Sequence, residues 1–293
     1  MQISVNGQSL FFDVVSPGLD PVGARMRPRP TLVVLHGGPG FDHASMRPEL
    51  DHFADMAQVI YLDHRGNGRS HPSDPANWTL AQWADDIRGF CDALSIQRPI
   101  VFGQSFGGMV AQAYATRHPG HAGGVIFSST AARMNLDAIL ATFARLGGVQ
   151  ARDVAERFWR HGDDAAVADY MRVCMPLYNT RARLGGEEAA QRVTRRMEVF
   201  RHFSLPGCEM WRMDFREGLA GVKVPALVLS GDSDPVTPSE CSQEIFEALP
   251  HGAKALHVFE KAGHGAYRDA PETVFPVVRA FVAGVWEKLS NKG

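Results

Sequence analysis

Short apolar runs and segments of helical periodicity alternate along most of this chain. The runs lack polar alternation, which is typical of strands that are buried on both faces of a parallel sheet. They fall at residues 31–35, 59–62, 100–102, 124–127, 226–229 and 256–259. Segments with apolar residues at helical spacing lie between them, at 80–94, 106–117, 239–249 and 272–289. This alternation predicts an α/β fold with a mostly parallel central sheet flanked by helices.

The two ends of the chain depart from this rhythm. Apolar residues at 3–5 and 10–15 flank Asn6-Gly7, a pair that favours a tight β-hairpin. A stretch rich in proline and arginine at 25–30 is predicted to be a link that leads into the first buried strand. Near the other end, Pro276 falls inside the predicted helix at 272–289, where it should kink the helix or delay its start.

Between residues 131 and 218 no segment has a convincing strand pattern. Helical spacing dominates instead, at 136–146, 151–159, 165–175 and 187–203. We therefore expect a core domain formed by residues 1–130 and 219–293, with a helical cap at 131–218 inserted between two of its strands.

The composition is that of an ordinary globular protein, and it argues against several classes of function. Hydrophobic residues make up 45% of the chain, enough for a large core. The net charge of −2 provides no field for nucleic acid or for an anionic membrane surface. No apolar run is long enough to span a bilayer, and the four cysteines form no C-x-x-C pair. Because the first residues carry no secretory pattern, the expected location is the cytoplasm.

The motif G-x-S-x-G occupies residues 103–107, between a predicted strand and a predicted helix. So sharp a turn forces Ser105 into strained backbone angles, and a Cβ at either glycine would strike a neighbouring element. The turn raises the serine hydroxyl above the sheet and points the positive end of the helix at it. A tight turn of small residues could carry the same letters, but the strand before and the helix after favour a nucleophile.

A serine nucleophile needs a base to take its proton, and the base needs a third group to orient it. Of the twelve histidines, His264 is the best placed, because it lies between two glycines just after a predicted strand. The loop after the strand at 226–229 offers two acids, Asp232 and Asp234, and spacing alone does not choose between them. A metal is not expected, since no histidine pair has ligand spacing.

The oxyanion of an acyl-transfer intermediate needs two backbone donors. Phe106 supplies one candidate amide, because it begins the helix that follows the serine. The second candidate is Gly38, in the run His36-Gly37-Gly38-Pro39-Gly40 after the strand at 31–35. Residues without side chains allow a carbonyl oxygen to approach this closely. The loop lacks the Lys-Ser/Thr ending of a phosphate loop, and this chemistry requires no cofactor.

Together these motifs resemble those of the proline iminopeptidase-like branch of the α/β-hydrolases. The resemblance rests on residues 36–40, 63–70, 103–108, 231–234 and 263–264, and the order serine, aspartate, histidine is that of the superfamily. It implies that Ser105 is the nucleophile, Asp234 the orienting acid and His264 the base. It also implies that the loop at 63–70 is structural and braces the glycine-rich loop.

The chain departs from the peptidases of this branch next to the serine. Those enzymes typically carry Gly-Gly-Ser-Trp-Gly, whereas here Gln104 and Phe106 replace the second glycine and the tryptophan. An aminopeptidase must also hold a substrate ammonium, which calls for a buried carboxylate near the site. Three cap residues are candidates by position: Glu198, Glu209 and Glu217. The other candidate substrate contacts are Gly37, Gln104, Trp159, Tyr178 and Trp211.

We therefore expect a serine hydrolase that cleaves a small ester, lactone or amide through an acyl-enzyme intermediate. A carboxylesterase or lactonase ranks ahead of a proline iminopeptidase-like aminopeptidase or amidase. Carbon–carbon bond hydrolysis, or a ligand receptor with little turnover on the same fold, stays open as an alternative. The expected partner is a small-molecule substrate, and the sequence indicates no particular oligomeric state.

Overall fold

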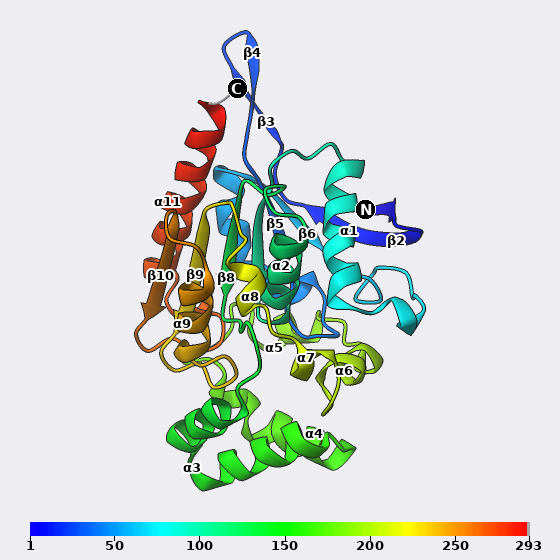
Figure 1. The fold of residues 1–293 in the computed structure, drawn as a ribbon, viewed down its shortest axis with the longest axis vertical. Coiled ribbons are helices and arrows are strands. Elements are labelled where there is room, and N and C mark those ends of the chain that lie inside the picture. The colour runs from blue at the N-terminus through cyan, green and yellow to red at the C-terminus, as the bar shows by residue number, and fades with distance from the viewer. Residues whose placement is uncertain (292–293) are drawn as a thin grey trace.

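The computed structural model describes residues 1–291. Its centre is an eight-stranded sheet in the order β1-β2-β6-β5-β7-β8-β9-β10 (Figure 1). The first two strands pair antiparallel with their neighbours, and the other six run parallel, as the pattern of apolar runs predicts. The strands are β1 (Gln2–Val5), β2 (Gln8–Val14), β5 (Thr31–Leu35), β6 (Gln58–Leu62), β7 (Ile100–Gln104), β8 (Gly124–Ser128), β9 (Ala226–Gly231) and β10 (Lys254–Phe259).

Helices cover both faces of this sheet. One face carries α1 (Leu80–Ala93), α2 (Phe106–Arg117) and α9 (Ser239–Ala248), and the other carries η2 (Glu49–Asp55), α10 (Ala266–Asp269) and α11 (Pro271–Ser290). Successive residues of β7 divide between the two cores: Val101 packs on the α1–α2 side, whereas Ile100 and Phe102 pack on the α11 side. All are fully buried, which explains why the strand reads as a continuous apolar run.

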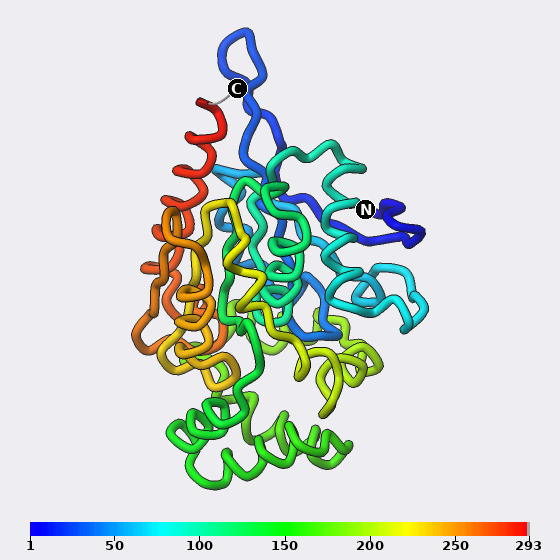
Figure 2. Tube along the Cα trace, viewed as in Figure 1, coloured from blue at the N-terminus to red at the C-terminus, as the bar shows by residue number. Residues whose placement is uncertain are grey.

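An all-helical insertion separates β8 from β9 and lies at the bottom of Figures 1 and 2. It contains α3 (Leu136–His161), α4 (Asp164–Val173), η4 (Met175–Leu177), α5 (Gly186–Gln191), α6 (Met197–Ser204) and α7 (Glu209–Arg212). The short α8 (Arg216–Leu219) follows and packs against α2 and α9. That the insertion behaves as a separate cap domain stays a prediction.

The two helices expected at 136–146 and 151–159 lie within α3, on either side of a kink at Gly148, where φ of 71° and ψ of −168° are not helical. Other expected helix boundaries in this region are wrong. The helix expected at 165–175 ends at Val173. The single helix expected at 187–203 is interrupted between α5 and α6, because backbone amides in this stretch donate to groups outside the helix. Thr194 N donates to the Asp42 carboxylate at 3.2 Å, and Arg196 N donates to Gly40 O at 2.7 Å.

The structure differs from the expectations near both termini. The stretch expected only as a link contains β4 (Arg25–Pro28), which pairs with β3 (Leu19–Val22) in an exposed hairpin at the top of Figure 1. Of the two effects expected of Pro276, the delayed start of α11 is wrong, because the helix begins at Pro271 and runs through Pro276; the kink stays a prediction. Proline is favoured at the first helical position, where no amide hydrogen bond is lost. The hairpin at Asn6-Gly7 forms as predicted, and both residues have positive φ.

Candidate active site

The carboxyl ends of β5, β7, β8, β9 and β10 lie at one edge of the sheet, and the candidate residues follow these strands. Ser105 directly follows β7 and caps α2, with φ of 55° and ψ of −121°. A Cβ at Gly107 would collide with the carbonyl oxygens of Leu35 and His36, which explains the second glycine of the motif. Ser105 N donates to Ser128 O at 2.9 Å, and Thr130 Oγ1 donates to Ser105 O at 2.8 Å. The turn is therefore held on both sides.

The two candidate acids occupy different environments. The Asp234 carboxylate is buried and lies 2.9 and 3.1 Å from His264 Nδ1. It also accepts hydrogen bonds from Val236 N, Thr237 N and Thr237 Oγ1, at 2.9, 2.9 and 2.8 Å. Asp232 is exposed, and among the residues described its carboxylate accepts only from its neighbour Ser233, while its backbone oxygen accepts from the Arg145 guanidinium. Asp234 is thus the acid that contacts the histidine.

The loop that carries His264 lies against the serine turn. Gly265 N donates to Ser129 Oγ at 3.0 Å, and Ser129 follows the residue that accepts the Ser105 amide. A Cβ at Gly265 would lie 3.4 Å from the side-chain nitrogen of Gln104, the residue before Ser105. Within residues 1–291 the Ser105 hydroxyl makes no hydrogen bond to a protein group, so the link from Ser105 to His264 is one of neighbouring loops. The hydrogen bond between a catalytic nucleophile and its base is often long without substrate and shortens when substrate binds.

The glycine-rich loop passes directly over the serine. A Cβ at Gly37 would lie 3.1 Å from Ser105 Cβ and 3.3 Å from Gln104 O. His36 Nδ1 lies 2.8 Å from Gly37 O, to which it donates. Because a trans peptide places C=O and N–H on opposite sides, this bond also fixes the direction of the Gly38 amide. In the described part of the chain, neither Gly38 N nor Phe106 N finds a protein acceptor, so both are available to an oxyanion.

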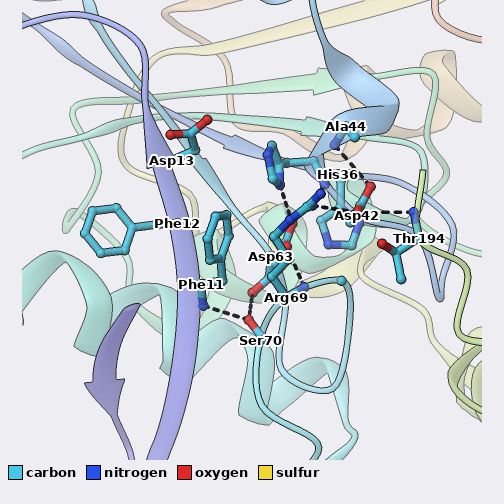
Figure 3. A network of polar contacts seen from close by, with 12 residues as sticks. Phe11, Phe12, Asp13, His36, Asp42, Ala44, Asp63, Arg69, Ser70 and Thr194 are labelled. Carbon is cyan, nitrogen blue, oxygen red and sulfur yellow. Dashed lines mark hydrogen bonds and ion pairs between the residues drawn. The ribbon is translucent and has the colours of Figure 1, made fainter. Parts of the chain in front are cut away.

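The loop at 63–70 braces this arrangement, as the resemblance implies (Figure 3). His64 N donates to His36 Nε2 at 3.1 Å, which assigns the proton of His36 to Nδ1. Asp63 accepts from Arg69 N and from His43, and Asp42 accepts from Ala44 N and the guanidinium of Arg69. Burial lowers the pKa of both His36 and His64, so both are neutral near pH 7 and serve as fixed supports.

The aromatic candidates of the cap serve mainly to pack it. Trp159 is buried against Phe158, Tyr170 and Trp211, and Trp211 Nε1 donates to Ser204 O at 2.9 Å. Tyr178 is different, because its ring centroid lies 5.4 Å from that of His264. Its hydroxyl pairs with that of Tyr170 at 2.9 Å, and burial raises the pKa of the Tyr178 phenol.

None of the three cap carboxylates offers a buried, unengaged charge. Glu198 is 59% exposed at its side chain, with Arg196 at 4.0 Å, and Glu217 is exposed as well. Glu209 is half-buried and accepts the Leu80 amide at 3.0 Å; burial raises the pKa of its carboxyl. The structure therefore does not place Glu198 or Glu217 as the buried partner that a substrate ammonium would require.

Gln104 is buried, and neither polar atom of its amide has a partner among residues 1–291. A cleft of about 870 Å³ lies away from this site, between α1, α2 and α7, and none of the candidate triad lines it. The residues described contain no cluster of His, Cys, Asp or Glu that could hold a metal ion. No helix in residues 1–291 is both long and apolar enough to cross a bilayer.

Residues 30–271 match the family described as alpha/beta hydrolase fold. The chain belongs to this family. It is 25% identical over 288 residues to the proline iminopeptidase PfmaB of Pestalotiopsis fici, which covers 95% of this chain and 97% of that protein. The crystal structure of proline iminopeptidase from Mycobacterium smegmatis matches with a TM-score of 0.76 at 22% identity, covering 97% of this chain and 98% of that one.

An esterase from Exiguobacterium antarcticum matches with a TM-score of 0.71 at 18% identity, covering 96% of this chain and 98% of that one. Other matching proteins carry names that refer to carbamate hydrolysis and to an enol-lactonase. The chain is therefore a hydrolase of the α/β family with a likeness to its proline iminopeptidase-like branch. Fold alone does not select among the reactions of these proteins.

Proposed function

We propose that this chain is a serine hydrolase that cleaves a small ester or lactone through an acyl-enzyme intermediate. The observation that carries the proposal is the contact between Asp234 and His264 Nδ1 at 2.9 Å, in a loop that lies against the Ser105 turn. Because Nδ1 faces the carboxylate, it holds the proton, and Nε2 is left as the base.

In the proposed reaction, His264 Nε2 takes the hydroxyl proton of Ser105 as Oγ attacks the carbonyl carbon of the substrate. The carbonyl electron pair moves to oxygen, where the amides of Gly38 and Phe106 donate to the oxyanion. When the intermediate collapses, the alcohol leaves with the proton from His264, and the acyl group stays on Ser105. Water then attacks with His264 as base, which releases the acid and restores the serine.

An ester or lactone substrate is favoured over an aminopeptidase substrate, because none of the three candidate cap carboxylates is both buried and free to bind an ammonium. Glu198 and Glu217 are exposed, and Glu209 already accepts the Leu80 amide beside a different cleft. A substrate ammonium bound at an exposed carboxylate would gain little, because water screens the pair. The aminopeptidase reading stays as the second candidate, since the likeness to a proline iminopeptidase covers 95% of this chain.

The test compares the wild type with Ser105→Ala on a short-chain p-nitrophenyl ester and on proline p-nitroanilide. We expect cleavage of the ester, and a loss of at least about four orders of magnitude in Ser105→Ala, because triad members act as a unit. Retained activity in Ser105→Ala would remove the serine mechanism. Efficient serine-dependent cleavage of the anilide would reverse the ranking of the two substrate classes.

A further inference from the structure

Asp269 is a buried carboxylate outside the candidate triad, at the end of α10 and close behind His264 in the sequence. Its side chain accepts hydrogen bonds from four N–H groups. Gly263 N donates to Oδ2 at 2.7 Å, and Thr180 N donates to the same oxygen at 3.1 Å. The Asn179 side-chain amide also donates to Oδ2, at 3.3 Å, and Arg181 N donates to Oδ1 at 3.1 Å.

Three of these four donors belong to one piece of the helical insertion, residues 178–181, which we call the cap strap. The strap also holds the backbone of His264 itself. Tyr178 O accepts the His264 amide, and Asn179 Nδ2 donates to His264 O at 2.9 Å. Thr180 Oγ1 donates to Lys261 O at 2.7 Å, just ahead of the histidine loop.

The histidine loop has little means of fixing its own shape. His264 stands between two glycines, and Gly265 has φ of 91°, a conformation that only glycine adopts freely. Both backbone polar groups of His264 are bound by the strap, and the amide of Gly263 is bound by Asp269. The backbone that carries the imidazole is therefore held by the strap, about 85 positions earlier in the chain, and by Asp269.

We propose that Asp269 is a positioning residue, which joins the cap strap to the histidine loop so that His264 meets Asp234 and Ser105 correctly only when the strap is docked. The inference rests on the proposed function, because it concerns the base of that reaction. Asp269 acts through hydrogen bonds to N–H groups and does not contact the reacting atoms. A displacement of about 1 Å in a reacting group can cost about 100-fold in rate, so the effect is measurable.

Asp269→Asn tests the proposal because it keeps the size of the side chain and replaces one acceptor with a donor that faces other donors. We expect kcat for the p-nitrophenyl ester to fall by about 10- to 100-fold, with KM changed by less than about two-fold. Asn179→Ala removes the bonds to His264 O and Asp269 from the strap side, and kcat should fall in the same direction. It is the test if Asp269→Asn does not fold.

Glu272→Gln is the matched control. Glu272 is exposed and pairs with the Arg181 side chain, so this variant loosens a surface contact of the strap and leaves the Asp269 bonds in place. Its kcat should stay within about two-fold of the wild type. An equal loss of kcat in Glu272→Gln and Asp269→Asn would mean that general loosening, and not positioning, explains the effect.

A double-mutant cycle with His264→Ala separates positioning from a merely structural role. If Asp269 acts through the imidazole, Asp269→Asn should change the residual ester hydrolysis of His264→Ala by less than about two-fold. The inference would be overturned if Asp269→Asn caused the same fold-loss with and without His264→Ala. It would also be overturned if kcat were unchanged in both Asp269→Asn and Asn179→Ala. These outcomes bear on the inference only if ester hydrolysis depends on Ser105. If Ser105→Ala retains activity, the proposed function is contradicted instead.

Discussion

Asp232 and Asp234 show how two residues between the same strand and helix acquire different chemistry. Asp234 receives the hydrogen bonds of Val236 N and Thr237 N and faces His264, while the side chain of Asp232 faces solvent. Asp234→Asn should lower kcat by about 10⁴-fold, because the amide can no longer stabilise the imidazolium and favours the wrong tautomer. Steady-state hydrolysis of the p-nitrophenyl ester measures the change.

Asp232→Asn is the control for this prediction, and its kcat should stay within about two-fold of the wild type. The two substitutions make the same chemical change two positions apart, and the melting temperature of each variant separates a loss of folding from a loss of catalysis. If Asp232→Asn were the damaging one, the acid of the proposed triad would be wrongly assigned.

Gly37 controls how close the glycine-rich loop comes to the serine. A Cβ there would lie 3.1 Å from Ser105 Cβ, closer than side chains normally approach. Gly37→Ala should therefore push the loop away from Ser105 and lower kcat by about 10-fold or more, since the Gly38 amide, one of the two proposed oxyanion donors, moves with the loop. KM and kcat on the ester, together with the melting temperature, measure this. An unchanged kcat would indicate that the oxyanion lies elsewhere.

At the scale of an element, the loop at 63–70 supports the glycine-rich loop through two buried neutral histidines. His64 stacks on Trp83 with ring centroids 4.9 Å apart, and its Nε2 has no partner within residues 1–291. Burial lowers the pKa of His64 and of His36 in the folded protein. The unfolded chain therefore binds protons that the folded chain does not, once the pH falls below about 6.5.

This linkage predicts that the free energy of unfolding falls as the pH is lowered from 7 to 5, by up to about 1.4 kcal/mol per pH unit for each such histidine. His64→Phe keeps the stacking on Trp83 and should reduce that slope. Hydrogen bonding from His43 lowers the pKa of Asp63 against the opposing effect of its burial, but that carboxyl titrates in a more acidic range. Urea unfolding at several pH values tests this, and equal slopes in both proteins would contradict it.

Turns and strands that are determined by neighbouring residues were predictable from the sequence. Features that depend on hydrogen bonds to residues far along the chain were not. Asn6-Gly7 and the glycines around Ser105 determine their turns through backbone sterics alone, so the pattern is sufficient. The break between α5 and α6 arises because Asp42 and Gly40 accept the amides of Thr194 and Arg196. The hairpin β3–β4 has no buried face, so no apolar alternation marks it.

The same distinction applies at the scale of the whole molecule. Ser105, Gly38 and His264 each stand among glycines at the end of a strand, which a local pattern can indicate. Asp269 has no such signal, because three of its four donors come from the cap strap, about 90 positions earlier in the chain. Trp159 and Trp211 were candidates for a pocket, yet most of their contacts hold the cap together.

The insertion packs on the helices of the sheet through an aromatic contact near the candidate site. Phe203 of α6 is fully buried, and its ring centroid lies 4.9 Å from those of Trp83 and Phe106. Phe106 carries one of the two proposed oxyanion amides, so this contact joins the attachment of the cap to the geometry of the site. Phe203→Ala should lower the free energy of unfolding by about 3–5 kcal/mol, because it leaves a cavity that these large rings cannot fill.

Urea unfolding of Phe203→Ala measures that loss, and ester hydrolysis in the same samples should show a reduced kcat as Phe106 loses its support. Val149→Ala is the control, because Val149 is also an apolar residue of the insertion but is 71% exposed. Its free energy of unfolding should change by less than about 0.5 kcal/mol. If Phe203→Ala lowered the free energy of unfolding by less than about 1 kcal/mol, the aromatic contact would contribute little. The cap would then be held mainly by the strap at residues 178–181, through its bonds to the histidine loop.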